Sequence, residues 1–176
     1  ASSRMYPAII FDQLREAGDQ ILEVDGLSAF DDAGEVLFKN LSFKLNRGDK
    51  VALLADDHRA VNALFEILEG KRQADAGSFS YGQTISSAFL PNENADYFDT
   101  DDNLMDWLRD YSPENKDEVF VRGFLGKMLF SGEEVFKSAR VLSGGEKVRC
   151  MLSRMMLQQA NLLFLDEPTN HLDLES

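Results

Sequence analysis

One stretch near the C-terminus limits what this chain can fold into more than any other part. Ser143 is followed by Gly144, Gly145 and Glu146, which is the capping-box pattern that opens a helix. The two glycines allow a ligand or another chain to approach the backbone closely. A helix N-terminus offers N–H groups and the positive end of the helix dipole, so this stretch favours an anion.

A second feature follows that helix. Residues 162–165 are all apolar, which is typical of a short strand buried on both faces of a parallel sheet. The strand ends at Asp166 and Glu167, and Pro168 stops it. Carboxylates at the C-terminal end of a buried strand lie where α/β sheets place their ligands. The two features together predict an α/β fold with a ligand site at this end of the strand.

These residues resemble the signature loop and the Walker B strand of ATP-binding-cassette (ABC) ATPases. The Thr-Asn-His-Leu-Asp form of the D-loop at residues 169–173 is similar to that of the F subfamily, soluble twin-cassette proteins that act on the ribosome. The resemblance covers residues 20–176. It implies a P-loop NTPase-like ABC nucleotide-binding domain with an antiparallel β subdomain and a helical subdomain at about residues 100–142. It also implies that the chain is C-terminally incomplete, because family members continue to a strand that ends in a switch histidine.

The order of the expected elements agrees with this fold. We interpret residues 1–18 as the end of an inter-domain linker and residues 19–176 as the cassette itself. The pattern predicts strands at residues 21–30, 36–45, 50–55, 78–81, 85–90 and 162–165. It predicts helices at residues 61–68, 103–110 and 114–130, a short helix after Ser131, and the signature helix from Ser143. A sheet that stops after residues 162–165 is expected to have an open edge.

The phosphate-binding loop is where the chain departs from the family pattern. A working P-loop, Gly-x-x-x-x-Gly-Lys-Ser/Thr, wraps phosphates with backbone amides, contacts them with lysine and ligates Mg²⁺ through the hydroxyl. Aligned without gaps, the two glycine positions, the lysine position and the hydroxyl position hold Ala55, Ala60, Val61 and Asn62. Asp56 and Asp57 add negative charge. Each lost charge-assisted contact is worth ~1.5–3 kcal/mol, so we expect this loop not to cradle a triphosphate in the usual way.

The resemblance implies roles for the remaining site residues. The signature residues that would bind an ATP held by the P-loop of a partner cassette are Ser143, Gly144, Gly145 and Glu146. Asp166 would hold Mg²⁺ through water, and Asn92, which is one methylene shorter than the family's Q-loop glutamine, would be a further metal contact. Glu167 would orient or deprotonate the attacking water. For Phe30 two interpretations stay open: stacking on adenine, or packing as a core residue at a strand end.

The leading hypothesis is therefore the second cassette of an F-subfamily ATPase. ATP and Mg²⁺ would be shared with a second cassette of the same protein, and the isolated chain would be inactive. Other parts of the parent protein would contact the ribosome or RNA. The alternatives are the ATP-binding subunit of an ABC membrane transporter and a non-hydrolysing regulatory cassette.

Composition limits the partners. The chain has 176 residues, of which 44% are hydrophobic, so one domain with a substantial core is expected. Its net charge of −13 repels nucleic-acid phosphates, so we expect little RNA contact from this domain. No membrane span or signal peptide is visible in the sequence. The one cysteine, Cys150, is expected in the core, and a single cysteine is consistent with a reducing compartment. We therefore expect a cytoplasmic location. His58 is expected to be an exposed loop residue and His171 a D-loop residue rather than a base.

Overall fold

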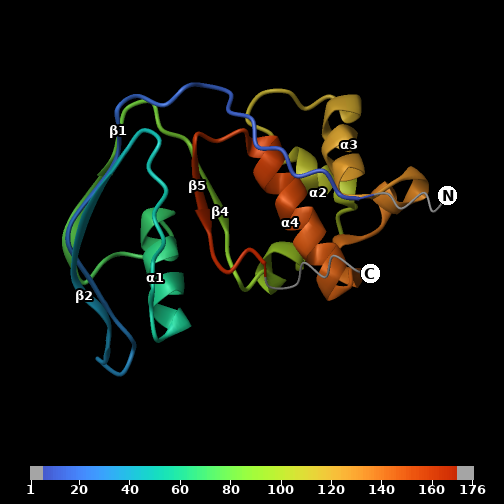
Figure 1. Cartoon of the computed structure of the whole chain (residues 1–176). Helices are drawn as coiled ribbons and strands as arrows, with labels where there is room; N and C mark the ends of the chain where they lie inside the picture. The colour runs from blue at the N-terminus through green and yellow to red at the C-terminus, as the bar shows by residue number, and fades with distance from the viewer. Residues whose placement is uncertain (1–5, 170–176) are drawn as a thin grey trace. The chain divides into compact units, whose positions relative to one another are not determined.

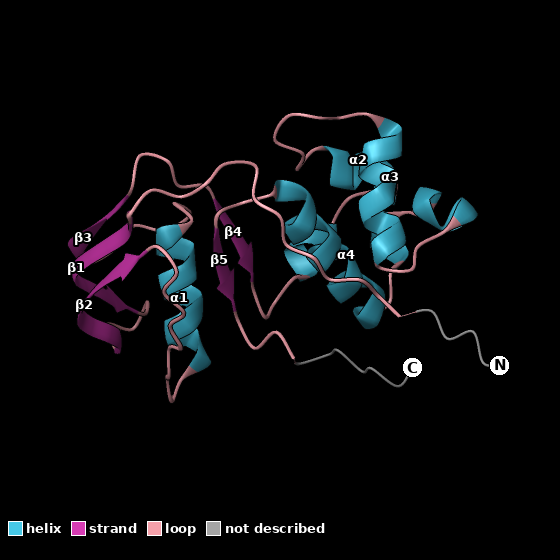
Figure 2. Ribbon diagram, turned by 45° about the horizontal axis from the view of Figure 1, so that its top comes forward, coloured by secondary structure: helices cyan, strands magenta, loops and turns pink. Residues whose placement is uncertain are grey.

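The computed structural model describes residues 6–169 and groups them into two compact units. The sheet unit comprises residues 15–91 and 161–166, and the helical unit comprises residues 6–14, 92–160 and 167–169. Figure 1 shows the elements of both units along the chain, and Figure 2 colours them by secondary structure. The fold is mixed α/β, as the sequence predicts.

The sheet unit contains an antiparallel sheet of order β2–β1–β3 and a parallel pair, β4–β5. β1 (Gln20–Phe30) pairs with β2 (Val36–Asn46) on one edge and with β3 (Ala76–Tyr81) on the other. β4 (Ser87–Leu90) and β5 (Leu162–Leu165) run parallel. The strands predicted in these places are confirmed. The prediction that β5 is buried on both faces is wrong, since Leu162 and Leu163 are half-buried and Leu165 is 42% exposed. Within residues 6–169 the second edge of β5 has no partner strand.

Helix α1 (His58–Leu68) lies between the antiparallel sheet and the β4–β5 pair (Figures 1 and 2). Three aromatic rings join the helix to the parallel strands. The rings of Phe89 and Phe164 stack with centroids 4.5 Å apart, and Phe65 of α1 meets them edge-on at 5.8 and 5.7 Å. Such pairs add ~0.5–1.5 kcal/mol each beyond the area that they bury. His58 is exposed as predicted, but it is the first residue of α1 rather than a loop residue.

Two glycines allow β3 and the residue after it to lie close to β1. A Cβ at Gly77 would lie 2.3 Å from the carbonyl oxygen of Gly26, and Gly77 also has a φ of +82°. A Cβ at Gly82 would lie 2.0 Å from the carbonyl oxygen of Gln20. Any other residue at these two positions would push the strands apart.

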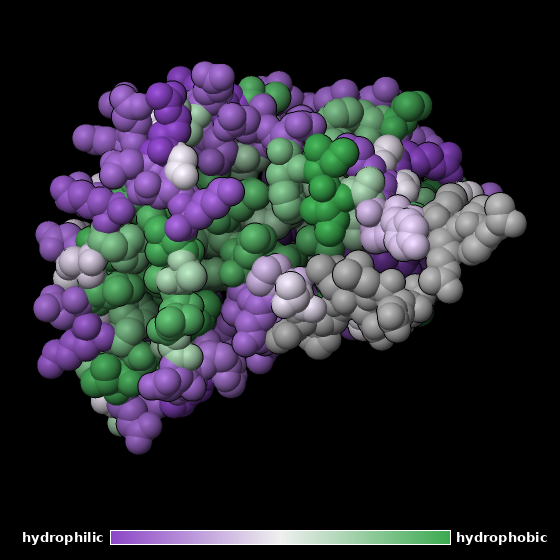
Figure 3. All heavy atoms as spheres, viewed as in Figure 1, coloured by the Kyte–Doolittle hydropathy of each residue, from purple (hydrophilic) through white to green (hydrophobic). Residues whose placement is uncertain are grey.

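Residues 50–55 do not form the strand that their apolar sequence predicts. They are neither helical nor paired, and the side chains of Val51, Leu53 and Leu54 are 58%, 42% and 97% exposed. A strand is stabilised by hydrogen bonds to a neighbour, and no strand in the described part of the chain pairs with this segment. Figure 3 shows hydrophobic residues gathered at the surface in the region where Figure 1 shows α1 and β5. The prediction failed because local composition does not supply a partner strand.

The helical unit is built around α2 (Leu104–Arg109), α3 (Glu118–Lys127) and α4 (Gly144–Gln158). Three short 3-10 helices connect them: η1 (Ala95–Phe98), η2 (Gly132–Phe136) and η3 (Ala139–Val141). Cys150 is buried on α4 as predicted, and the other large buried side chains of α2 and α4 include Trp107, Met151, Met155 and Met156. α3 is shorter than the predicted helix at 114–130. Before the helix, the Asn115 side chain accepts the N–H of Asp117, so residues 115–117 are not helical. After the helix, Leu129 has a φ of 69°, which does not continue a right-handed helix.

Residues 6–14 form a strap along the helical unit. Three N–H groups hold it: Ala8 donates to the Lys127 carbonyl (2.8 Å), Ile10 to the Met156 sulfur (3.4 Å) and Leu14 to the Gln159 carbonyl (2.9 Å). The strap is therefore fastened to the C-terminal ends of α3 and α4. It is the described part of the stretch that the sequence predicts to be a linker end.

Candidate functional site

The signature stretch opens α4 with a complete capping box. The Ser143 Oγ accepts the N–H of Glu146 at 3.2 Å, and the Glu146 Oε1 accepts the N–H of Ser143 at 3.1 Å. Ser143, Gly144 and Gly145 are exposed, and a Cβ placed on either glycine would meet nothing within 4 Å. The N–H groups of these two glycines stand at the first helical positions, where a helix provides no acceptor of its own. The opening of α4 therefore presents donors to solvent with open space in front of them.

Glu146 also has a charged partner. Its second carboxylate oxygen, Oε2, lies 2.7 Å from the Lys137 Nζ. The hydrogen bond from Lys137 is the main reason that the pKa of Glu146 lies below its ordinary value, and the N–H of Ser143 lowers this pKa further. The only acid in the first turn of α4 is thus held ionised and is neutralised by a lysine from outside the helix.

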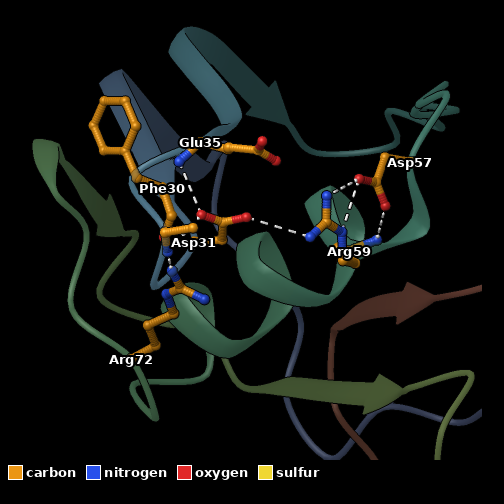
Figure 4. A network of polar contacts seen from close by, with 7 residues as sticks. Phe30, Asp31, Glu35, Asp57, Arg59 and Arg72 are labelled. Carbon is orange, nitrogen blue, oxygen red and sulfur yellow. Dashed lines mark hydrogen bonds and ion pairs between the residues drawn. The ribbon is translucent and has the colours of Figure 1, made fainter.

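The start of α1, where a P-loop would stand, is arranged differently (Figure 4). Asp57 is the N-cap: its Oδ1 accepts the N–H of Arg59 at 2.9 Å, and its Oδ2 accepts the Nε of the same arginine at 2.9 Å. The hydrogen bond from the Arg59 side chain is the main reason that the pKa of Asp57 lies below its ordinary value, and the bond from the Arg59 N–H lowers this pKa further. The Arg59 guanidinium also lies 3.4 Å from Asp31 in the β1–β2 turn. A carboxylate and its own arginine therefore occupy the opening of this helix.

A pocket of about 220 Å³ lies beside this network. Its charged and polar lining comprises Asp31, Asp32, Glu66, Arg59, Arg72 and Asn62. Arg72 donates to the carbonyl oxygen of Phe30, and Figure 4 shows the Phe30 ring on the other side of Asp31 from Arg59. The ring is half-buried, so both interpretations of Phe30 stay open.

The residues of this loop do not fit the phosphates of ATP. No glycine or lysine stands between Ala55 and Asn62. The first-turn donor that a phosphate would use, the N–H of Arg59, is already bonded to Asp57. Asn62 lies within α1 and lines the mixed-charge pocket.

The Walker B carboxylates fall in different units. Asp166 follows β5 in the sheet unit, is 9% exposed, and donates its N–H to the Leu90 carbonyl at 2.9 Å. It therefore lies at the carboxyl end of the two parallel strands, as predicted. Glu167, exposed and with a φ of 44°, and half-buried Asn92 belong to the helical unit. The predicted grouping of these three side chains around Mg²⁺ stays a prediction.

Among residues 6–169, no three or more His, Cys, Asp or Glu side chains are arranged to hold a metal ion. His171 lies outside the described residues, so its predicted role is not addressed by the structure. Lys137 and Arg59 are not predicted from the sequence as site residues. For Arg59 a signal was present, since it stands two residues after an N-cap acid; for Lys137 no sequence periodicity points to Glu146.

Known proteins are similar to the chain in sequence and in fold. The profile of the family described as "ABC transporter" matches residues 38–170. The chain is 56% identical over 176 residues to the "Uncharacterized ABC transporter ATP-binding protein YkpA" of Bacillus subtilis, covering 99% of this chain and 32% of YkpA. It is 34% identical over 161 residues to the "Energy-dependent translational throttle protein EttA" of Mycobacterium tuberculosis, covering 90% of this chain and 29% of EttA. The chain thus spans about a third of the length of these relatives.

Solved structures agree on the fold. A bacterial Atm1-family ABC exporter with ATP bound superimposes with a TM-score of 0.71 at 16% identity, covering 98% of this chain and 34% of that one. An inward-facing putative metal-chelate type ABC transporter gives a TM-score of 0.67 at 24% identity, covering 89% of this chain and 64% of that one. Within the described residues, no helix has the length and apolar character needed to cross a membrane.

Proposed function

The chain belongs to the ABC transporter family of ATP-binding domains, and on that premise we propose that it lends the opening of α4 to an ATP molecule held by a second cassette. ABC domains bind ATP and Mg²⁺ and work with a partner cassette. In this pair the chain's own P-loop segment holds no triphosphate. The active site is therefore asymmetric: one cassette supplies the phosphate-binding loop, and this chain supplies the signature.

The observation that supports this proposal is the contrast between the two helix openings. At α4 the glycines are exposed and the first-turn acid is neutralised by Lys137. At α1 the cap is a carboxylate, and Arg59 closes over it. An incoming anion meets available donors at the first opening and a filled cap at the second.

The residues at α4 have definite roles in such a site. The Ser143 Oγ accepts the N–H of Glu146, which leaves its hydroxyl proton to donate to a terminal phosphate oxygen. The N–H groups of Gly144 and Gly145 donate beside it, and the dipole of the 15-residue helix favours the negative charge. Mg²⁺ and the partner's P-loop supply the remaining charge stabilisation. In a site with an intact P-loop, Asp166 would hold Mg²⁺ through water and Glu167 would orient the attacking water. Because this chain's own loop holds no triphosphate, we assign neither carboxylate a part in the site at α4.

We also propose a subfamily and a cellular role for the chain. We place the chain as the second cassette of a cytoplasmic F-subfamily protein with a role on the ribosome, and the similarity to EttA, named as a translational throttle protein, supports this. The competing candidate is a transporter ATP-binding subunit, which the naming of YkpA as an ABC transporter ATP-binding protein favours. Gradient sedimentation of the tagged parent protein separates the two, because the first predicts a ribosome-bound fraction and the second a membrane-bound fraction.

Two measurements test the asymmetric site. Calorimetric titration of the chain with Mg-ATP should give no binding up to about 1 mM, because several charge-assisted contacts are missing. Micromolar affinity would disprove the claim that this loop holds no triphosphate. The second measurement uses YkpA in which this chain replaces the matching 176 residues.

In this exchange protein, Ser143→Arg should lower Mg-ATP hydrolysis by about a hundredfold, because it removes one donor and fills the space before the glycines. Ser131→Arg is the matched control. Ser131 is an exposed serine that caps a short helix of the same unit without a side-chain hydrogen bond, so its replacement should leave the rate within twofold. Equal rates for wild type and Ser143→Arg would rule out the contribution of the signature.

A further inference from the structure

Lys137 is held rigidly beside the opening of α4. It stands between Val135 and Ala139, both of which have no exposed surface. Its carbonyl accepts the N–H of Leu104, the first residue of α2, at 3.1 Å. The next residue, Ser138, forms an isolated bridge with Asn103. The lysine is therefore presented from a fixed backbone, and its Nζ lies 2.7 Å from the Glu146 Oε2.

Glu146 creates an electrostatic conflict that this lysine resolves. A carboxylate in the first turn stabilises the helix and completes the capping box. The same carboxylate would repel a phosphate that approaches the N–H groups of Gly144 and Gly145. Glu146 can cap α4 without opposing a phosphate only if its charge is balanced from a direction that leaves the glycines open. Lys137 does this, because it bonds the carboxylate oxygen that the Ser143 N–H does not use.

We infer that Lys137 is a positioning residue for the shared ATP site: it neutralises Glu146 so that the opening of α4 accepts a terminal phosphate. This inference rests on the proposed function. Lys137 acts through Glu146 and the local potential, and it makes no contact with the nucleotide.

The test uses the same YkpA exchange protein, with inorganic phosphate release from Mg-ATP as the measurement. Lys137→Met should lower kcat/KM by about fivefold at low salt, the size of a single charge at a helix terminus. The loss should shrink in 0.5 M KCl, because salt screens exposed charges. Lys116→Met is the matched control: Lys116 is an exposed lysine of the same unit, so its replacement makes the same change in net charge.

The decisive variant is Lys137→Met combined with Glu146→Gln. Glutamine keeps both bonds of the capping box but carries no charge, so the double variant should return to within twofold of wild type. Failure of the double variant to recover would show that Lys137 acts only as a structural tie, and an unchanged Lys137→Met would show that it has no role. If wild type is inactive, or Ser143→Arg has no effect, the proposed function fails and this inference fails with it.

Discussion

The chain contains two helices that begin at candidate phosphate sites, and their openings differ. α1 begins at Asp57, whose carboxylate is bonded to the backbone and side chain of Arg59 two residues later. α4 begins at Ser143, whose hydroxyl caps the helix while the nearby acid is balanced by a lysine nine residues away in sequence. In α1 the counter-charge is local and closes over the opening. In α4 it comes from another element and leaves the opening free.

This difference shows that a helix N-terminus does not by itself define an anion site. Both helices have the same dipole and the same unsatisfied N–H groups at their first turns. Whether an external anion can bind these N–H groups depends on two things. One is which group caps the helix, and the other is the side from which the compensating charge approaches. The difference can be tested at either opening.

The largest effect concerns Cys150 on α4. Burial raises the pKa of its thiol to about 12, from an ordinary value of 9.0. The thiolate fraction at pH 8 should therefore be about a thousandfold lower than in an unfolded peptide. Stopped-flow labelling with a disulfide reagent should be slow in native protein and fast in urea. Fast native labelling would mean that α4 leaves its buried position, and the comparison of the two openings would lose its basis.

The second effect is a gain of binding at α1. The substitutions Ala55→Gly, Asp57→Gly, Ala60→Gly, Val61→Lys and Asn62→Ser restore the P-loop pattern and remove the carboxylate cap. They should strengthen Mg-ATP binding by about a hundredfold or more, since two recovered contacts suffice for that factor. Calorimetry measures the change. The control variant keeps Asp57 and should gain less; equal gains would show that the carboxylate cap does not oppose the phosphate.

The third effect is on stability at α4. Ser143→Ala removes the hydroxyl that caps α4 and should lower the free energy of unfolding by ~1 kcal/mol, as is usual for an N-cap. Ser143→Asn, which can still cap, is the matched control and should stay close to wild type. Urea unfolding followed by far-UV circular dichroism gives both values. A fully stable alanine variant would contradict the capping geometry.

The smallest effect is a pH dependence of Glu146. Because its folded-state pKa lies below the ordinary value of 4.5, its ion pair stabilises the protein above that pH. This contribution is lost as the pH falls below 4.5 through the lowered pKa. Thermal unfolding should thus show a higher melting temperature for wild type than for Glu146→Gln at pH 7, and the difference should shrink as the pH falls below 4.5. A gap that does not narrow as the pH falls below 4.5 would point to a cause other than the charge.

Several parts of the fold could be predicted because their signals are local. The Ser143-to-Glu146 spacing predicts the capping box of α4, and the apolar run at β5 predicts the strand that ends at Asp166; the structure confirms both. The exposed segment at residues 50–55 shows the limit of such signals. Its composition favours a strand, but pairing depends on another segment, which the local sequence does not reveal.

The polar partners of the site could not be predicted for the same reason. The Asp31–Arg59 pair joins residues 28 positions apart, and it depends on the β1–β2 turn lying over α1. The Lys137–Glu146 pair depends on a 3-10 connection fixed at the start of α2. Sequence motifs located the candidate donors, whereas the charges that keep one opening free and close the other are set by tertiary structure.

The strap at residues 6–14 has a mechanical consequence. It is fastened to the C-terminal end of α4, whereas Ser143 stands at the other end of the same helix. At 1.5 Å per residue, the 15 residues of α4 make a rod about 22 Å long. Because the strap is bonded to the C-terminal end of α4, a force on the strap would act on the end of the helix opposite the signature serine.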